Sequence, residues 1–568
     1  MKYISTAAAL ALLLSSCSFL DVKPVIIEDT PYSSKTEVLY GLAGCYGVIN
    51  NEEFYGNYYS LMLSGCDDLC YFNRTSTSNF SMWYRHDASS AEIYAAWTEI
   101  YSGIKNANAV MTKVENSEYD PDHICYNEAR FLRAYYHFIL AQTWGNVPLK
   151  LKEDRSAENL SVAATPQYDV LKWCISEMDE CLALASESLE NTPSRVSRTT
   201  MQGILARVCL FTAGATVDRN DGVSEKDYYK KAMDYAKAVI DSGKHRLNPS
   251  YSQVFINMIS DLYDTDYRES MWEADFVGNQ SSADNWSNGR IGDEIGLLNT
   301  ASTDFMLFKS NYSYGRYNGS LKLWDMYLNQ DRTTGEKGDL KDARAEWNLP
   351  PFNYKGGGKY PPYGQTEGTC KAGIDRTPYS GKAEDNKTYS TTENPTVAGA
   401  VRNCGKYRRE VQYEGHQDSK RLRTQINYPI LRYSDVLLMY AEAYNEYYQA
   451  PSQEAYDYVA EVRTRAGVST NPFSDYSDYA SFRDFVRNER GRELCFESLR
   501  KYDLIRWGIF VEQMHKYADW TSDARWSDVT TANLAASTGT TVQDKHIVMP
   551  IPSIELGVNT LLRQHPLW

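Results

Sequence analysis

The stretch Asn427-Tyr-Pro-Ile-Leu-Arg-Tyr-Ser-Asp-Val-Leu-Leu-Met-Tyr-Ala-Glu-Ala443 decides the fold of this chain. Its apolar residues recur at steps of three or four, which is the spacing of one face of an α-helix. One stripe consists of Ile430, Leu437, Tyr440, Ala441 and Tyr444, and a second, acidic stripe of Asp435, Glu442 and Glu446. Pro429 suits the first turn of a helix, where no backbone donor is needed. The stretch therefore predicts an amphipathic helix that begins close to Pro429.

Helical patterns continue after this stretch. A partner helix is predicted over residues 453–466, where Gly467 ends it. A charged helix is predicted over residues 481–506, in which Arg and Glu alternate. Such alternation, for example Arg490 with Glu493, is typical of a salt-bridged scaffold rather than of a catalytic site. Beyond it the chain closes in an irregular polar sequence.

The first half of the chain carries the same signal several times. Helical spacing begins at Thr36 and returns over residues 97–111 and 130–144, where Gly145 and Pro148 end the helix. Three more helices start near residues 168, 199 and 228, about 30 residues apart. This spacing approaches the tetratricopeptide repeat of about 34 residues, although the full consensus is absent. It predicts a mostly α fold built on stacked helix–turn–helix repeats.

The chain changes character between these two helical parts. Residues 278–425 hold 18 of the 34 glycines, mixed with Asn, Ser, Thr and many aromatic residues. A helical repeat is incompatible with that composition, so a large, irregular, loop-rich insert is expected there. Loops of this kind usually carry binding function.

The helical and irregular parts, together with the N-terminus, give five segments. Residues 1–16 are predicted to be a signal peptide, because Lys2 precedes a short apolar run that ends in Leu14-Ser-Ser-Cys17. This ending is similar to the lipobox of bacterial lipoproteins, in which the cysteine becomes the lipid anchor; the alternative is a plain secretory signal with an incidental Cys17. The remaining segments are a tether (17–35), an N-terminal helical scaffold (36–243) with an irregular loop (52–90), the irregular binding region (244–425) and C-terminal helices with a closing segment (426–568).

Charge and motifs argue against several function classes. The formal charge is −15 and no basic run occurs, which argues against nucleic acid as a partner. No His pair at i, i+4 and no Gly-x-Ser-x-Gly elbow is found, so no catalytic residue, cofactor or metal site is predicted. A pair of glycosidase carboxylates stays open, because sequence alone does not place acids in space. Export would permit a disulfide between Cys66 and Cys70.

Several segments together resemble the RagB/SusD family of nutrient-uptake outer-membrane lipoproteins. They are the lipobox at Cys17, Glu128-Ala-Arg-Phe-Leu-Arg-Ala-Tyr-Tyr136 with Trp144-Gly-Asn-Val-Pro148, Arg432-Tyr-Ser-Asp-Val-Leu-Leu-Met-Tyr-Ala-Glu442, Arg490-Gly-Arg-Glu-Leu-Cys-Phe-Glu497 with Tyr502-Asp-Leu-Ile-Arg-Trp507, and Met549-Pro-Ile-Pro552 with Gln564-His-Pro566. They follow the family's order over essentially the whole chain. The family ending Gln-Asn-Pro-Gly is replaced here by Gln564-His-Pro-Leu567.

The resemblance implies a fold and a function. Such proteins carry four tetratricopeptide-like helix pairs as a scaffold and an irregular half that binds ligand. They sit on the outer-membrane surface as lids on SusC-like TonB-dependent transporters, and they usually capture glycans without catalysis. Binding of a peptide or another nutrient, or a protein-interaction scaffold without a small ligand, are the alternatives.

Sugar recognition needs aromatic rings for the apolar face of a pyranose and polar partners for its hydroxyls. Aromatic residues next to polar ones on irregular segments are therefore the candidates. They are Trp83, Tyr84 and Arg85; Asn285, Trp286 and Arg290; and Tyr312, Tyr314 and Tyr317. Each has a structural alternative, since Trp83 can pack a loop onto the scaffold and the tyrosines alternate like a strand with one buried face. By contrast, Trp97, Trp144, Trp272, Trp324 and Trp507 lie in periodic or family-like segments and are predicted to pack inside.

Overall fold

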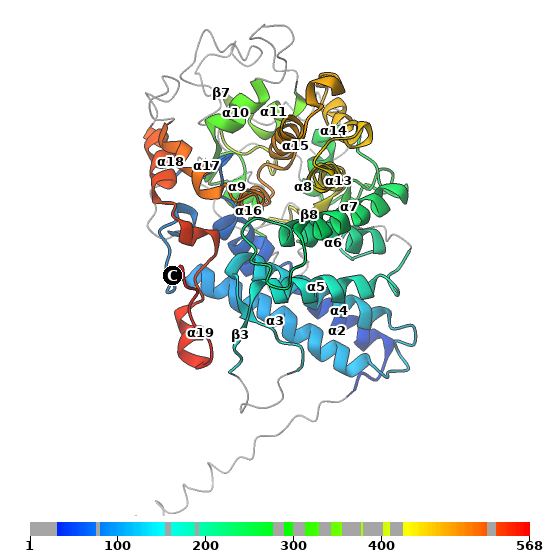
Figure 1. Cartoon of the computed structure of the whole chain (residues 1–568). Helices are drawn as coiled ribbons and strands as arrows, with labels where there is room; N and C mark the ends of the chain where they lie inside the picture. The colour runs from blue at the N-terminus through cyan, green and yellow to red at the C-terminus, as the bar shows by residue number, and fades with distance from the viewer. Residues whose placement is uncertain are drawn as a thin grey trace, which may run out of the picture.

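The computed structural model describes residues 31–74, 80–153, 161–187, 192–276, 289–298, 313–328, 342–350, 352–354, 376–378, 402–408, 424–519 and 530–568. Helices dominate these residues, as Figure 1 shows. The prediction of a mostly α fold is confirmed.

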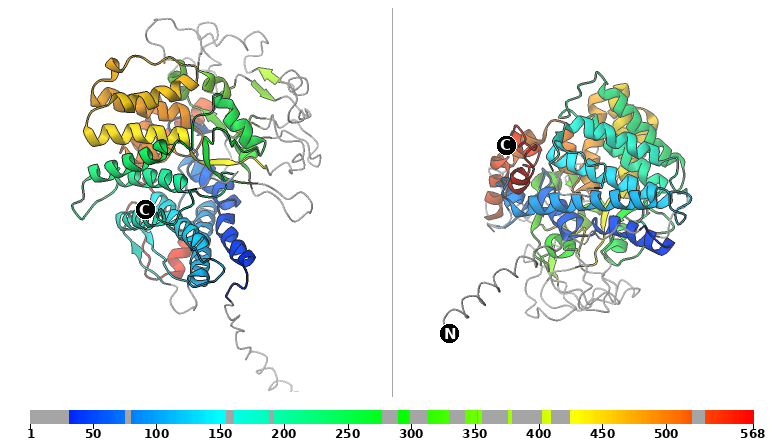
Figure 2. Two further views of the ribbon diagram at one scale, coloured as in Figure 1. Left: turned by 90° about the vertical axis from the view of Figure 1, so that its right-hand side faces the viewer. Right: turned by 90° about the horizontal axis from the view of Figure 1, so that it is seen from below.

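Six helices of the first half stack in chain order. They are α2 (Lys35–Gly47), α3 (Ala91–Val114), α4 (Ile124–Trp144), α5 (Gln167–Cys181), α6 (Arg198–Thr212) and α7 (Glu225–Asp241). Each packs on the next one, and the second view in Figure 2 shows the row of helices from below. The sequence positions of these helices agree with the predicted ones, including the three that start about 30 residues apart.

Local sequence explains where these helices begin and end. The side chains of Ser197 and Ser224 accept hydrogen bonds from backbone N–H groups in the first turns of α6 and α7. Gly145 ends α4 with a φ of +77°, a conformation that side chains other than glycine rarely adopt. Gly203 of α6 lets Leu431 approach so closely that a Cβ atom would lie 2.6 Å from the leucine Cδ2.

The C-terminal helices extend the same stack. The α13 helix (Tyr433–Tyr448) packs on α7, and both α14 (Gln453–Arg465) and α15 (Tyr479–Leu494) pack on α13. They are followed by α16 (Arg500–Arg506), α17 (Phe510–Asp519), α18 (Thr530–Thr541) and α19 (Ser553–Val558). Because α17, α18 and α19 lie after residue 506, the prediction of an irregular closing segment was wrong in part.

Two helix boundaries differ from the prediction. Pro429 lies in β8 (Tyr428–Arg432), which pairs antiparallel with β4 (Ser270–Ala274), so the helix begins only at Tyr433. The predicted charged helix over 481–506 is two helices, α15 and α16. In the segment that joins α15 to α16, Phe496 and Ser498 have φ of +64° and +58°, which a helix does not allow.

The central region consists of short elements. Its helices are α8 (Tyr251–Ile259), α9 (Ile291–Ile295), α10 (Leu321–Leu328) and α11 (Ala343–Asn348).

Three more two-stranded pairs accompany the β4–β8 pair. They are β1 (Cys70–Phe72) with β5 (Tyr317–Gly319), β2 (Val147–Pro148) with β3 (Ala164–Thr165), and β6 (Phe352–Tyr354) with β7 (Arg376–Pro378). Elsewhere in the chain are two short π-helices, η2 (Glu52–Gly56) and η3 (Tyr58–Leu63). There are also three short 3-10 helices, η4 (Phe80–Trp83), η10 (Phe473–Tyr476) and η12 (Asp544–Ile547).

The interior combines aromatic packing with buried charge. All five tryptophans assigned to packing are buried, which confirms that prediction. The predicted salt-bridged scaffold is also present: Arg490 of α15 pairs with Asp435 of α13 at 2.7 Å and with Asp503 of α16 at 2.9 Å. Among the described residues, no helix combines the length and the apolar composition needed to cross a membrane.

Candidate functional site

Two of the segments that the sequence singled out meet at one small sheet. The strands β1 and β5 pair antiparallel, with Phe72 opposite Tyr317. Beyond the ladder, the Asn73 backbone N–H donates to the Arg316 carbonyl at 2.8 Å. The Asn73 side chain donates to Asn318 Oδ1 at 2.6 Å. This pairing and these hydrogen bonds hold residues 70–73 against residues 316–319, although some 240 residues separate them in the sequence.

Trp83 ends η4 beside this sheet and is half-buried. Its indole packs edge to face on Phe72, with ring centroids 6.1 Å apart. The guanidinium of Arg85 lies 5.3 Å from the centre of the same indole ring, within cation–π range. Arg85 itself is exposed and donates to Ser537 Oγ at 2.7 Å, while Thr541 Oγ1 donates to the Trp83 carbonyl at 3.1 Å. Helix α18 therefore holds both residues in place.

The tyrosine segment contributes a second half-buried ring. The guanidinium of Arg316 lies 4.4 Å from the ring centre of Tyr314. Arg74 Nη2 donates to the Tyr314 carbonyl at 2.5 Å, which again joins the two segments. Both aromatic rings at this site, Trp83 and Tyr314, are thus accompanied by an arginine.

Two of the predicted aromatic residues are part of the core instead. Tyr84 is 3% exposed, and its hydroxyl donates to the Cys66 carbonyl at 2.5 Å. Tyr317 is fully buried, and its hydroxyl donates to the Leu61 carbonyl at 2.5 Å. Burial raises the pKa of both phenols well above the ordinary value. Neither ring has a face to offer a ligand, so the structure contradicts their assignment to the binding surface.

Arg290 is likewise engaged inside the protein. Its guanidinium donates to Glu52 Oε1 at 3.2 Å and to Asp293 Oδ2 at 2.8 Å, and it pairs with Glu294 at 2.5 Å. With three carboxylates around it, this side chain acts as a structural ion-pair centre and not as a sugar contact. Of the other predicted residues, Asn285, Trp286 and Tyr312 lie outside the described residues, as does Cys17.

Sequence reasoning missed the helix that supports the site. Ser537 and Thr541 come from a segment rich in Ala, Ser and Thr with little hydrophobic periodicity, so nothing in the sequence linked them to Trp83. Arg74 and Arg316 carry no motif either. The pairing of β1 with β5 brings their two segments together, and both arginines contact Tyr314.

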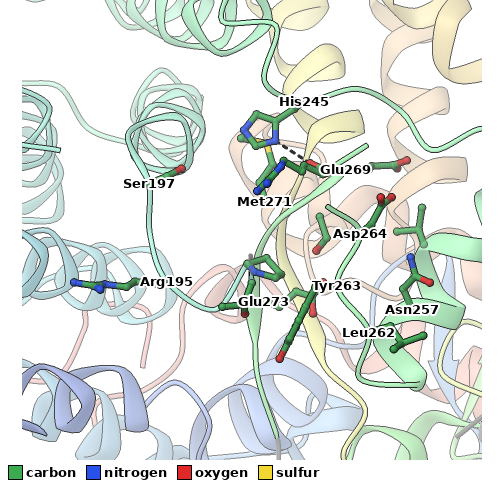
Figure 3. Close-up of a pocket in the computed structure, with 15 residues that line it drawn as sticks. Arg195, Ser197, His245, Asn257, Leu262, Tyr263, Asp264, Glu269, Met271 and Glu273 are labelled. Carbon is green, nitrogen blue, oxygen red and sulfur yellow. Dashed lines mark hydrogen bonds between the residues drawn. The ribbon is translucent and has the colours of Figure 1, made fainter. Parts of the chain in front are cut away.

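Figure 3 shows a different cavity, next to β4. Its volume is about 40 Å³, which leaves room for about three water molecules. Tyr263, Glu269 and Glu273 are among its lining residues. Burial raises the pKa of Glu273 to about 7. The cavity is too small for a sugar ring, because ligand pockets hold about 300–1,000 Å³.

The described cysteines are buried free thiols. Cys66 and Cys70 are among them, and Cys70 Sγ donates to the Gly65 carbonyl at 2.9 Å, so the permitted disulfide is not formed in this structure. Among the described residues, no group of three or more His, Cys, Asp or Glu side chains is arranged to hold a metal ion.

The mostly helical fold agrees with comparisons against known proteins. The model of the SusD family matches residues 268–568, which is more than half of the chain. The chain belongs to the SusD family. A second model, described as "Starch-binding associating with outer membrane", matches residues 18–210. The predicted family is thereby confirmed. SusD-family glycan-binding proteins are non-catalytic, which confirms the prediction that the chain is not an enzyme.

Relatives of this SusD-family chain cover nearly its whole length. SusD-like protein P25 of Formosa agariphila is 23% identical, over 95% of this chain and 93% of its own. A solved SusD homolog from Bacteroides thetaiotaomicron superposes with a TM-score of 0.77 at 22% identity and covers 96% of this chain and 100% of its own. Surface glycan-binding protein A from Bacteroides uniformis superposes with a TM-score of 0.63 at 19% identity, over 94% of this chain and 100% of its own. At such identities the two structural similarities establish the fold alone.

Proposed function

We propose that this SusD-family chain is a cell-surface lipoprotein that captures an oligosaccharide at a surface formed by Trp83, Arg85 and Tyr314. The observation that carries the proposal is the pairing of β1 with β5: Phe72 of β1 contacts the Trp83 ring, and Arg74, just after β1, donates to the Tyr314 carbonyl. Single exposed aromatic residues are common on proteins, but here two half-buried rings each have an arginine beside them. Both are tied to this sheet, Trp83 through its contact with Phe72 and Tyr314 through the hydrogen bond from Arg74.

The chemistry of the surface suits a sugar. The apolar face of a pyranose can pack on an indole or phenol ring, and Arg85 and Ser537 offer polar partners for hydroxyl groups. Such partners matter because a buried hydroxyl without a hydrogen bond costs free energy. The rings gain little beyond the area that they bury, so the expected affinity is modest.

The proposal extends to delivery and location. We propose that the chain is anchored by lipid at Cys17 in the outer membrane, faces the outside of the cell, and passes its ligand to a SusC-like TonB-dependent transporter. The model described as associating with the outer membrane supports this location. The formal charge of −15 supports a partner other than nucleic acid.

Replacing Trp83 tests the binding surface. A glycan array first identifies the sugar that the wild-type protein binds, and affinity electrophoresis in that glycan then compares variants. Trp83→Ala should lose most of its retardation, and Trp286→Ala tests the second predicted tryptophan in the same gel. Trp173→Ala is the matched control, because Trp173 is also half-buried but packs on His137 within the helical stack.

Equal retardation of wild type and Trp83→Ala would remove Trp83 from the site. Failure to bind any glycan on the array would contradict the proposed ligand class.

A further inference from the structure

A groove separate from the Trp83 surface is lined by residues of α10, α15, α17 and η10. Figure 1 labels the three helices. Its volume is about 770 Å³, within the range of about 300–1,000 Å³ that is typical of ligand sites. None of its lining residues belongs to the 80–85 or 313–319 segments. Its uncharged or acidic lining residues include Asn471, Asp475, Tyr476, Asp484, Asn488 and Gln513.

An aromatic ring is fixed in one wall of this groove. The half-buried ring of Tyr476 stacks on Phe485, with centroids 4.1 Å apart and ring planes within 17°. Phe485 in turn stacks on Tyr456, with centroids 6.2 Å apart. Because this stack already holds Tyr476, a ligand that packs on its ring loses little affinity to ordering of the side chain.

Each of the four cations that line the groove is already paired with a carboxylate. Lys322 pairs with Asp68, and Lys516 with Glu512. The remaining two, Arg463 and Arg492, both pair with Glu489, at 3.0 and 2.9 Å. The groove therefore has little positive charge left to attract an anion.

Two of the three acidic side chains that line the groove face solvent. The side chain of Asp484 is 67% exposed and forms one long ion pair, 3.6 Å, with Arg483 Nε, and Asp475 is exposed as well. Asn488 is exposed on the same helix, one turn after Asp484. Carboxylates accept hydrogen bonds from hydroxyl groups, and amides both donate and accept them.

From this combination we infer that the groove is a second saccharide site, which binds uncharged pyranose units by packing on Tyr476 and by hydrogen bonds to Asp484 and Asn488. Only the class of ligand rests on the proposed function; the location does not. Uronic-acid units are disfavoured, because two exposed carboxylates repel them and the cations are paired. Two sites on one chain would raise the retention of a long glycan by avidity.

Saturation-transfer NMR on the Trp83→Ala protein tests this site by itself. The probes are maltohexaose, laminarihexaose and xylohexaose at millimolar concentration, with trigalacturonic acid as the acidic probe. We expect saturation transfer to at least one neutral probe and none to trigalacturonic acid. Adding Tyr476→Ala should abolish the transfer. Adding Asp484→Ala with Asn488→Ala should do the same. Because both side chains are exposed, a loss of transfer in this variant is not explained by a folding defect. Adding Tyr40→Ala, an exposed tyrosine of α2, should leave it unchanged.

The outcomes separate this inference from the proposed function. Absence of transfer to all three neutral probes, or transfer that survives both sets of groove substitutions, overturns the second site. Stronger transfer to trigalacturonic acid than to the neutral probes also overturns it. The Trp83 surface is judged separately, by the retardation of Trp83→Ala against its Trp173→Ala control.

Discussion

At the scale of single residues, Glu273 shows how burial makes stability depend on pH. It lies in β4 at the cavity of Figure 3, 3% exposed, and accepts a hydrogen bond from Asn427 Nδ2 at 3.0 Å. Burial raises its pKa from 4.5 to about 7. The neutral acid therefore stabilises the fold below about pH 4.5, and that stabilisation is lost as the pH rises through about 7.

Glu273→Gln should consequently be more stable than the wild type above neutral pH. Gln keeps the shape and the acceptor oxygen but does not ionise, so we expect a gain of at most about 3 kcal/mol near pH 8 that disappears below about pH 4. Urea unfolding across this pH range measures it. Glu512→Gln, on the exposed face of α17, should show no such trend. A gain for Glu273→Gln that is equal at all pH values would contradict the assignment of the raised pKa.

At the scale of elements, one arginine joins β8 to α15. Arg432 is fully buried at the end of β8, and its guanidinium donates to Glu269 at 3.0 Å and to Glu493 at 2.9 Å. It also donates to Glu497 at 2.9 Å. The cations of the network hold the pKa of Glu493 well below its usual range despite its burial, so this carboxylate stays charged inside the protein.

Arg432→Met should destabilise the protein by about 3–5 kcal/mol, because it leaves buried carboxylates without one of their cations. Chemical denaturation measures the loss. The matched control is Arg198→Met, whose surface pair with Glu187 should contribute less than about 1 kcal/mol. If both variants lost the same small amount, the buried network would not hold β8 and α15 together.

Periodicity in the sequence was enough to locate most helices but not the elements that depend on distant partners. The predicted helix over 453–466 agrees with α14, because its apolar spacing and Gly467 are local signals. Pro429 was misplaced because β8 exists only through its pairing with β4, about 155 residues earlier. The same limit applies to the site. Trp83 was predicted from its polar neighbours and is half-buried, yet the next residue, Tyr84, is buried in the core and no local pattern distinguishes the two.

At the scale of the whole molecule, two family models match separate parts of one packed body. Residues 18–210 match one model and residues 268–568 the other. The structure nevertheless joins the two parts through buried contacts. Trp272 of β4 packs on Tyr135 of α4 with centroids 4.7 Å apart, and Arg207 of α6 pairs with Asp435 of α13 at 2.7 Å. Helix α7 packs on α13 along the same boundary.

The two halves should therefore not fold independently. A fragment of residues 36–243 would expose the faces of α6 and α7 that α13 and β8 cover, and it would leave Arg207 without its carboxylate. We expect this fragment to be helical by circular dichroism but to bind a hydrophobic dye and to lack a cooperative thermal transition. The full chain should unfold in a single calorimetric transition. Co-expression with residues 244–568 should restore that transition, because the buried faces then meet again. A sharp transition in the isolated fragment would mean that the helical stack is stable without its C-terminal helices.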